Sequence, residues 1–172
     1  DLIRSFWQEG EVMEEEQLSV RIVRRINEVP QDTWDSLLRD GSPFMRWDWL
    51  DCLEESNCVC DKTGWAPHHL IVERGKQILG ACPMYLKSHS MGEFVFDQQW
   101  AGYAAQTGIE YYPKILVGVP FTPVAGSRFL TVPGIERRNI IAVLGRALIE
   151  ICRSNKLSSI HINFCDQEEM DA

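Results

Sequence analysis

The sequence predicts a mixed α/β domain, and the clearest evidence is a strand–helix–strand order in its second half. Residues 159–164 alternate apolar and polar side chains, which is typical of a half-buried strand. The segment that begins at Lys114 is almost wholly apolar and predicts a buried strand, and the helical period of 136–154 predicts a helix between the two strands. Such a βαβ unit places its two strands side by side and parallel.

The first part of the chain predicts one strand and two helices. Residues 18–26 are rich in β-branched side chains and favour a strand. Residues 30–40 open with a proline, have apolar positions at helical spacing and end before Gly41, so they predict a short helix. Residues 43–57 predict a second helix with a broad aromatic face. Both helices are expected to cover one face of the sheet.

A β-hairpin and a long loop are expected in the middle of the chain. Residues 68–87 alternate with a period of two around a turn at 74–76, and Pro83 predicts an edge or a bulge in the second arm. The segment 88–113 is predicted to be mostly irregular, with at most a remnant of a strand at Phe94–Phe96. Because it is long and rich in aromatic, amide and acidic side chains, we expect it to form part of a functional site.

The net charge of −8 is concentrated at the two ends. We expect 1–18 to be an acidic, disordered tail, 19–165 to be the folded unit, and 166–172 to be an acidic end. The body is nearly neutral, so no general surface for nucleic acid is predicted. No apolar run approaches the roughly 18 residues of a transmembrane helix, so no membrane span is expected.

The six cysteines are expected to be reduced thiols, because the amino terminus does not resemble a secretory signal. This favours an intracellular, reducing compartment: the cytoplasm, or the chloroplast if a transit peptide preceded the chain. Cys58-x-Cys60 followed by His68-His69 suggests zinc, but the cysteine spacing is tighter than zinc sites usually have. Small buried cysteines and structural histidines are the favoured interpretation, and no metal site is predicted.

The loop before the long helix contains Ala125-Gly126-Ser127-Arg128. Backbone N–H groups in a small-residue loop near a helix amino terminus often bind anions. The residues leave two interpretations open, a site for a phosphate-bearing cofactor or only a tight turn.

Several segments together resemble a known family. They are SPF at 42–44, LEESN at 53–57, TGWAPHHL at 63–70, MYLKSHSMGEFVFD at 84–97, YYPK at 111–114, VPFTPVAGSRFL at 119–130 and LSSIHINF at 157–164. In this order they resemble predicted N-acyltransferases related to the Fem-type peptidyltransferases, within the acyl-CoA N-acyltransferase (GNAT-like) superfamily. The resemblance extends from Ser19 to Glu169.

The resemblance implies an incomplete GNAT-like fold and an acyl-CoA co-substrate that inserts between the strands at 114–119 and 159–164. The loop at 125–128 has one glycine and one arginine rather than the usual glycine-rich pattern of that superfamily, so an aminoacyl-tRNA donor stays open. Related chains continue into a second, similar half, so this chain is expected to be the first part of a longer protein. Whether this part is active alone is left open.

The resemblance also implies the residues that would bind the donor. Backbone N–H groups near Val117 and Val119 would polarise the acyl carbonyl, and Arg128 would meet phosphate bidentately. The alternative for Arg128 is an ordinary surface arginine after a turn. The full set of expected donor-binding residues is Val117, Val119, Thr122, Ala125, Gly126, Ser127 and Arg128.

Glu93, His89 and Asp97 are the candidate catalytic bases in the long loop. A carboxylate partly buried among aromatic side chains would have a raised pKa, suited to accepting a proton near neutrality. Each of them is as well explained by a solvated or capping role. His161 either lines the cleft between the strands or is exposed.

The expected partner is an amine-bearing small molecule or a peptide, which would accept the acyl group. Two other readings stay open. The aromatic loop would serve equally well in a non-catalytic module that binds a peptide or a glycan. The last strand, at 159–164, would have an unpaired edge that permits self-association.

Overall fold

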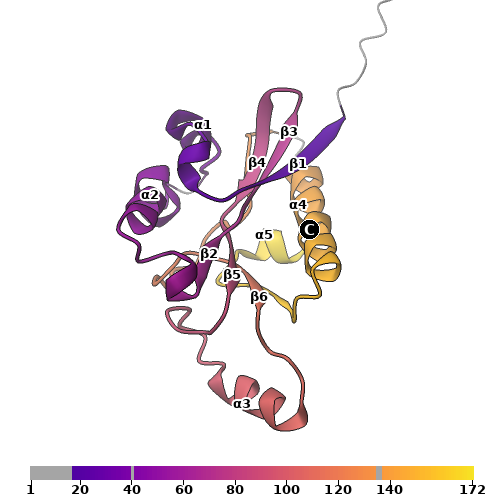
Figure 1. Ribbon diagram of the computed structural model, residues 1–172. Coiled ribbons are helices and arrows are strands. Elements are labelled where there is room, and N and C mark those ends of the chain that lie inside the picture. The colour runs from indigo at the N-terminus through magenta and orange to yellow at the C-terminus, as the bar shows by residue number, and fades with distance from the viewer. Residues whose placement is uncertain (1–16, 40, 135–136) are drawn as a thin grey trace, which may run out of the picture.

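The computed structural model describes residues 17–39, 41–134 and 137–172. The predicted mixed α/β class is confirmed: helices flank two four-stranded sheets, with strand orders β1-β3-β4-β7 and β2-β5-β6-β8 (Figure 1). The strands are β1 (Leu18–Val23), β2 (Trp65–Pro67), β3 (His69–Arg74), β4 (Gln77–Cys82), β5 (Met84–Lys87), β6 (Lys114–Val117), β7 (Leu130–Thr131) and β8 (Ile160–Ile162). The α-helices are α1 (Gln31–Ser36), α2 (Trp47–Glu55), α3 (Gln98–Thr107), α4 (Arg137–Ser154) and α5 (Gln167–Met170).

One long hairpin joins the two sheets. His68 alone separates β2 from β3, and Pro83 alone separates β4 from β5. The His68 N–H donates to the Met84 carbonyl at 2.8 Å, so the two arms stay hydrogen-bonded across the break. A proline has no N–H to give to a sheet ladder, and the chain passes from the first sheet to the second at that residue. The irregularity expected at Pro83 is therefore the change of sheet.

The predicted βαβ unit is confirmed. Strands β6 and β8 are parallel neighbours with Leu116 opposite His161, and α4 connects the strand β7 back to β8. The helix α4 buries one apolar stripe, which includes Ile140, Leu144 and Leu148, against the sheets (Figure 1). The core on this side contains Leu70, Val72, Leu79, Cys82, Met84, Ile115, Val117, Phe129, Ile140, Ile141, Leu144 and Leu148.

The helices α1 and α2 cover the opposite face of the first sheet, as expected. Trp34, Met45 and Leu50 are almost fully buried and pack in one cluster with Ile71 and Ala81 of the hairpin. The predicted helix at 43–57 is divided in the structure, because a 3-10 turn at Pro43–Met45 precedes α2. Pro43 at the first position of that turn suits its fixed backbone angle.

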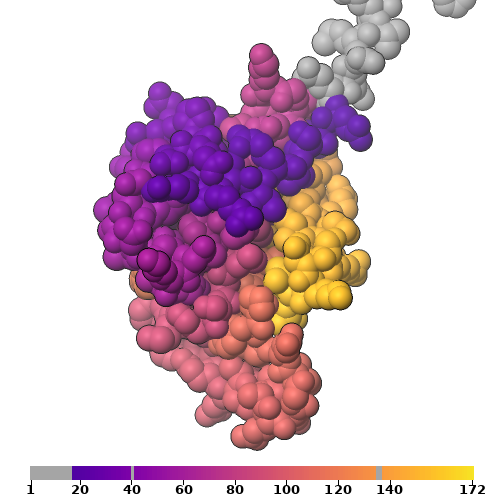
Figure 2. Space-filling view, viewed as in Figure 1, coloured from indigo at the N-terminus to yellow at the C-terminus, as the bar shows by residue number. Residues whose placement is uncertain are grey.

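The segment 88–113 differs from its prediction. It contains a ten-residue helix, α3, and Phe94–Phe96 forms no strand. Alanine and glutamine favour a helix, and Gly108 ends it in the left-handed conformation, with a φ of 73°. Ala104 is the buried residue of α3, so the helix stands away from the core at the lower end of the molecule (Figures 1 and 2). We call residues 94–109 the α3 arm.

The two predicted acidic ends have different outcomes. Residues 1–16 lie outside the described residues, and Leu18 already begins β1. At the other end α5 forms, and the Asp166 side chain accepts a hydrogen bond from the Glu169 N–H at its start. Within the described part of the chain, no helix combines the length and apolar character that a membrane crossing needs.

Gly80 in β4 tests the packing between α4 and the first sheet. A Cβ at this position would clash with Cγ2 of Ile140, so we expect Gly80→Ala to lower the free energy of unfolding by about 1–3 kcal/mol. Gly145 within α4 has no atom within 4 Å of its Cβ position, so Gly145→Ala should stabilise by about 0.5–1 kcal/mol. Urea denaturation of both variants measures the difference, and equal effects would contradict the packing described.

Candidate functional site

Two buried lysines lie side by side where β5 ends and β6 begins. Lys87 and Lys114 are partners in the antiparallel register, and neither is exposed to solvent. They lie on the sheet face opposite α4, as do Tyr85 and Leu116 of the same strands, which pack with Trp65. A buried ammonium group is costly unless carboxylates or hydrogen-bond acceptors surround it. The surroundings of these two side chains therefore define the candidate site.

The Lys114 ammonium is held by two buried carboxylates. Its Nζ lies 2.9 Å from Oε2 of Glu93 and 2.7 Å from Oδ2 of Asp97, and it donates to Ser90 Oγ at 3.0 Å. The Tyr111 hydroxyl donates to the same oxygen of Asp97 at 2.9 Å. Residues on both sides of the α3 arm thus converge on one lysine of β6. We call Lys87, Glu93, Asp97 and Lys114 the lysine–carboxylate cluster.

The pKa values of the two carboxylates in this cluster are shifted in opposite directions. Burial raises the pKa of Glu93, although the nearby Lys114 opposes this, so the direction expected from the sequence is confirmed for this residue. Burial also acts to raise the pKa of Asp97, but hydrogen bonds from Lys114, Ser90 and Tyr111 outweigh it and lower the pKa to about 2. The raised pKa expected for Asp97 is wrong, because the sequence does not show these donors.

Lys87 has a different environment from Lys114. Its Nζ lies 3.6 Å from the centroid of the Trp65 ring and donates to the Met91 carbonyl at 3.3 Å. Burial lowers its pKa to about 7, with the charge of Lys114 acting in the same direction and that of Glu93 opposing it. A substantial fraction of this side chain is therefore a neutral amine near pH 7.

His89 and His161 have different positions relative to the lysine–carboxylate cluster. His89, a predicted base, is outside the cluster: its Nδ1 accepts the Met91 N–H at 3.2 Å. His161 of β8 is half-buried beside Tyr111, with ring centroids 6.2 Å apart. Burial and the charge of Lys114 lower the pKa of His161. Of the two alternatives for His161, full exposure is excluded because the ring is half-buried, and a position in a cleft between the strands stays a prediction.

Among the described residues, the group with metal-ligand geometry is Glu93, Asp97 and His161, whose ligand atoms lie within 4.8 Å of one another. The cysteine–histidine set considered for zinc does not gather. His69 is fully buried, and its Nε2 contacts the Glu54 carboxylate at 2.8 Å. All six cysteines are free thiols.

In the predicted anion-binding loop, 125–128, hydrogen-bond donors already donate to acceptors within the chain. The Gly126 N–H donates to the Phe164 carbonyl at 3.0 Å, and Ser127 Oγ donates to Asp166 at 3.1 Å. The N–H groups of Arg128 and Phe129 both donate to the Glu169 carboxylate, at 2.8–2.9 Å. A carboxylate thus holds the position that a phosphate was expected to take. Phosphate binding by this loop stays a prediction.

Arg128 is a buried side chain, with 1% of its surface exposed. Its Nε donates to the Asn163 carbonyl at 2.8 Å, and its terminal nitrogens donate to the carbonyls of Ser127 and Val124. The alternative of an ordinary surface arginine is therefore wrong. The guanidinium connects the loop to the end of β8, and its role in binding phosphate is untested.

The predicted carrier slot would lie at the carboxyl ends of β6 and β8. Their pairing extends to the Asn163 N–H, which donates to the Val117 carbonyl at 3.0 Å. Val117 and Val119 are buried in the two main cores, Thr122 is half-buried and Ala125 is exposed. The predicted donor-binding residues therefore follow the carboxyl end of β6. The lysine–carboxylate cluster begins at its amino end, roughly 10 Å away along the strand.

The loop after β6 nevertheless reaches the segment before α3. The Phe121 N–H donates to the Gly92 carbonyl at 3.2 Å, and the Phe121 ring lies 5.3 Å from that of Trp65. The segment 88–113, which the sequence predicted to form part of a functional site, therefore contacts this loop. Phe121, Gly92 and Met91 lie around the same indole ring that contacts the Lys87 amine.

The sequence of the chain also matches a known protein family. Residues 25–172 match the family described as FemAB-like, peptidoglycan biosynthesis/recognition. The chain belongs to this family. No curated protein and no solved structure matches the chain significantly. This match confirms the resemblance to the Fem-type family that the sequence showed.

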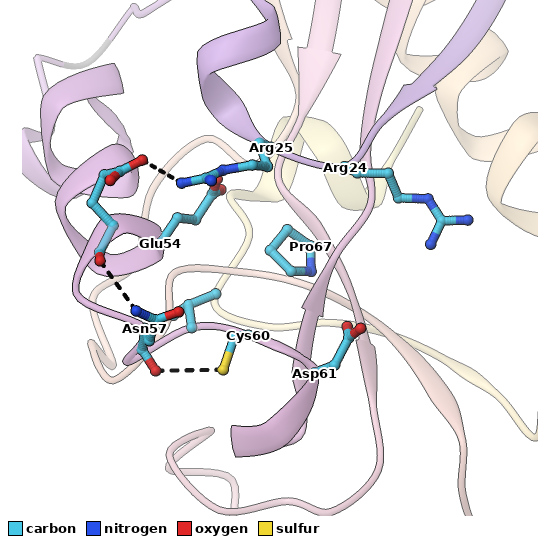
Figure 3. Close-up of a pocket in the computed structure, with 9 residues that line it drawn as sticks. Arg24, Arg25, Glu54, Asn57, Cys60, Asp61 and Pro67 are labelled. Atoms are coloured by element: carbon cyan, nitrogen blue, oxygen red, sulfur yellow. Dashed lines mark hydrogen bonds and ion pairs between the residues drawn. The ribbon is translucent and has the colours of Figure 1, made fainter.

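The FemAB-like chain also has a pocket away from the cluster (Figure 3). It has a volume of about 310 Å³ and lies beside the end of α2. Its lining residues are Arg24, Arg25, Glu54, Glu55, Asn57, Val59, Cys60, Asp61 and Pro67. Much of its polar lining is internally paired: Arg25 contacts Glu55, and Glu54 accepts the Ile26 N–H at 2.9 Å. None of the residues predicted as catalytic or donor-binding lines this pocket.

Sequence reasoning missed the two lysines of the cluster. Both belong to segments that carried the resemblance, MYLK and YYPK, but they were not assigned a role. A signal was available, because Lys114 begins a strand whose other residues are all apolar, and Lys87 is in phase with the aromatic Tyr85. A charged residue at an inward position of a strand indicates a buried pair or a site.

Removing the Lys114 ammonium should destabilise the fold. Lys114→Met leaves Glu93 and Asp97 buried without their shared partner, so we expect the free energy of unfolding to fall by about 3–5 kcal/mol. Lys76→Met in the exposed turn between β3 and β4 is the matched control and should stay within about 0.5 kcal/mol of the unchanged protein. Chemical denaturation monitored by tryptophan fluorescence measures both, and a loss for Lys114→Met no larger than the control's contradicts the buried ion pairs.

Lys87 should make the stability depend on pH above neutrality. Its pKa is about 7 in the folded protein and about 10.5 for the unperturbed side chain. Between these values the unfolded chain binds more protons, so the free energy of unfolding rises with pH, by at most about 1.4 kcal/mol per pH unit. Subtracting the curve for Lys87→Met from that of the unchanged protein isolates this slope. Parallel curves from pH 7 to pH 10 would show that the amine is not desolvated.

Proposed function

We propose that this FemAB-like protein transfers an acyl or aminoacyl group to an amine, with the lysine–carboxylate cluster accepting the proton that the amine loses. The observation that carries the proposal is Lys87, a buried amine whose pKa is lowered to about 7. Amide formation needs the acceptor amine in its neutral form and a group that takes its proton near neutral pH. Lys87 has that property, and its place beside the loop after β6 supports a role in the transfer.

The bond changes assign a role to each side chain. The acceptor nitrogen attacks the acyl carbonyl carbon, the new C–N bond forms and the bond to the thioester sulfur or ester oxygen breaks. The nitrogen's proton passes to Lys87 Nζ, and the leaving group takes up a proton in turn. Glu93 stabilises the lysine once it is protonated, and Lys114 and Asp97 position the segment that contains Glu93.

The donor would enter beyond Val117, at the carboxyl ends of β6 and β8. Its carbonyl would be polarised by N–H groups near Val117 and Val119, and its phosphate would replace Glu169 on the N–H groups of Arg128 and Phe129. Acyl-CoA and an aminoacyl-tRNA both carry the required phosphate and activated carbonyl. For the acceptor, the family description favours an amine on a peptide or an amino sugar of the peptidoglycan type.

The proposed base is tested by transfer assays with the full chain. Purified protein is incubated with acyl-CoA donors and lysine-containing peptides or amino sugars, and the amide product is measured by mass spectrometry. We expect Lys87→Gln to lower kcat by about 10²-fold or more, because general base catalysis contributes 10²–10⁴-fold. Lys76→Gln, at the exposed turn, should leave kcat unchanged.

Two results would count against this function. A folded Lys87→Gln variant that transfers at the unchanged rate removes Lys87 from the chemistry. If the protein turns over neither acyl-CoA nor aminoacyl donors and shows no heat of binding for coenzyme A, the transferase function is rejected.

A binding module is the second candidate, because the α3 arm exposes aromatic side chains. Phe96, Trp100 and Tyr103 are 75%, 70% and 63% exposed, and aromatic faces of this kind stack on sugar rings and on peptide side chains. Calorimetry with soluble peptidoglycan fragments tests this candidate. Binding that Trp100→Ala abolishes and Lys87→Gln leaves unchanged favours recognition over transfer.

A further inference from the structure

We propose that Glu93, Asp97 and His161 form a binding site for a divalent metal cation of the Mn²⁺ class. Each residue offers one ligand atom, and the three atoms lie within 4.8 Å of one another. Carboxylate oxygens suit Mn²⁺, and an imidazole nitrogen is a ligand that first-row transition metals accept. Three protein ligands leave coordination positions for water or for a substrate.

The inference depends on two buried carboxylate oxygens, one of Glu93 and one of Asp97. Glu93 and Asp97 are each 4% exposed, yet Oε1 of Glu93 and Oδ1 of Asp97 are buried without a hydrogen-bond partner. Buried carboxylate oxygens are nearly always hydrogen-bonded or bound to a cation, because an unsatisfied buried acceptor is costly. A metal ion that binds at these oxygens would satisfy both at once.

The Lys114 ammonium occupies the position of the cation in the structure. It lies 2.7 Å from Asp97 and 2.9 Å from Glu93, so the carboxylates already gather around one positive charge. A divalent ion at the unpaired oxygens and this ammonium would compete for the negative charge of the same two carboxylates. When displaced, Lys114 keeps Ser90 Oγ as an acceptor, and the rings of Tyr111 and Tyr112 lie 5.3 and 5.6 Å from its Nζ.

The three ligand residues come from two separate parts of the fold. Glu93 and Asp97 belong to the segment that leads into α3, and His161 is fixed opposite Leu116 by the parallel pairing of β6 and β8. A bound cation would therefore join the base of the α3 arm to the edge strand. This inference does not rest on acyl transfer, because cation binding is measured without a donor or an acceptor.

Mn²⁺ is the probe of choice, because it prefers oxygen ligands to the six free thiols of the chain. The full chain is treated with a chelator, dialysed and titrated with MnCl₂, with binding measured by calorimetry and by the loss of the free Mn²⁺ signal in electron paramagnetic resonance. We expect one saturable site per chain and a Tm that rises with Mn²⁺ concentration. His161→Gln should weaken binding by about tenfold or more.

His89→Gln is the matched control, because His89 lies in the same segment but outside the ligand set. It should bind Mn²⁺ as the unchanged protein does. Absence of a saturable site, or a site that persists unchanged in both His161→Gln and Glu93→Gln, would overturn the proposal.

Lys114→Met separates a cation site from a purely structural ion-pair cluster. Without the competing ammonium, Mn²⁺ should bind more tightly than in the unchanged protein, and it should restore part of the Tm that the substitution removes. If the cluster is only structural, Mn²⁺ restores nothing. Should Lys114→Met fail to fold, the comparison of the unchanged protein with His161→Gln and His89→Gln decides alone.

Discussion

The fold around the candidate site depends on the Lys114 ammonium, which is buried between Glu93 and Asp97. No alternative partner in water is within reach of a fully buried side chain, so the carboxylates must stay in place for the lysine to remain charged. This requirement fixes the segment before α3. Tyr111, on the far side of the helix, binds the same Asp97 and fixes the return of the chain. A single charge in β6 thus positions a helix that has almost no core of its own.

The two sites considered for an ionic ligand, among the carboxylates and at the loop 125–128, are each occupied by the chain's own side chains. Lys114 fills the space among the carboxylates, and Glu169 covers the N–H groups after the loop at 118–127. The two sites lie at opposite ends of β6, a strand of four residues. The loop after β6 contacts the segment before α3 through Phe121, which meets Gly92 and Trp65. Ligand binding at either end therefore means exchanging one ionic partner for another, rather than filling an open cavity.

The sequence predicted the parts of the fold that depend on local pattern. The parallel pair, the helix α4 and the hairpin follow from periodicity, and Pro83 marked the change of sheet because its missing N–H is a local property. The helix α3 was missed, because aromatic and polar residues obscured its modest helical preference. The low pKa of Asp97 and the burial of Arg128 could not be predicted, since both depend on residues such as Tyr111 and Asn163 that come near only in the folded chain.

The exposed aromatic residues of the α3 arm have a consequence for divergence among relatives of this protein. Trp100 and Tyr103 carry no packing in the core, and the helix is held by anchors outside it. Substitutions on this surface would change what the arm contacts with little cost to folding, whereas the anchors tolerate few changes. The chemistry of this surface and the integrity of the fold therefore depend on different residues, so the exposed face can change while the anchors are retained.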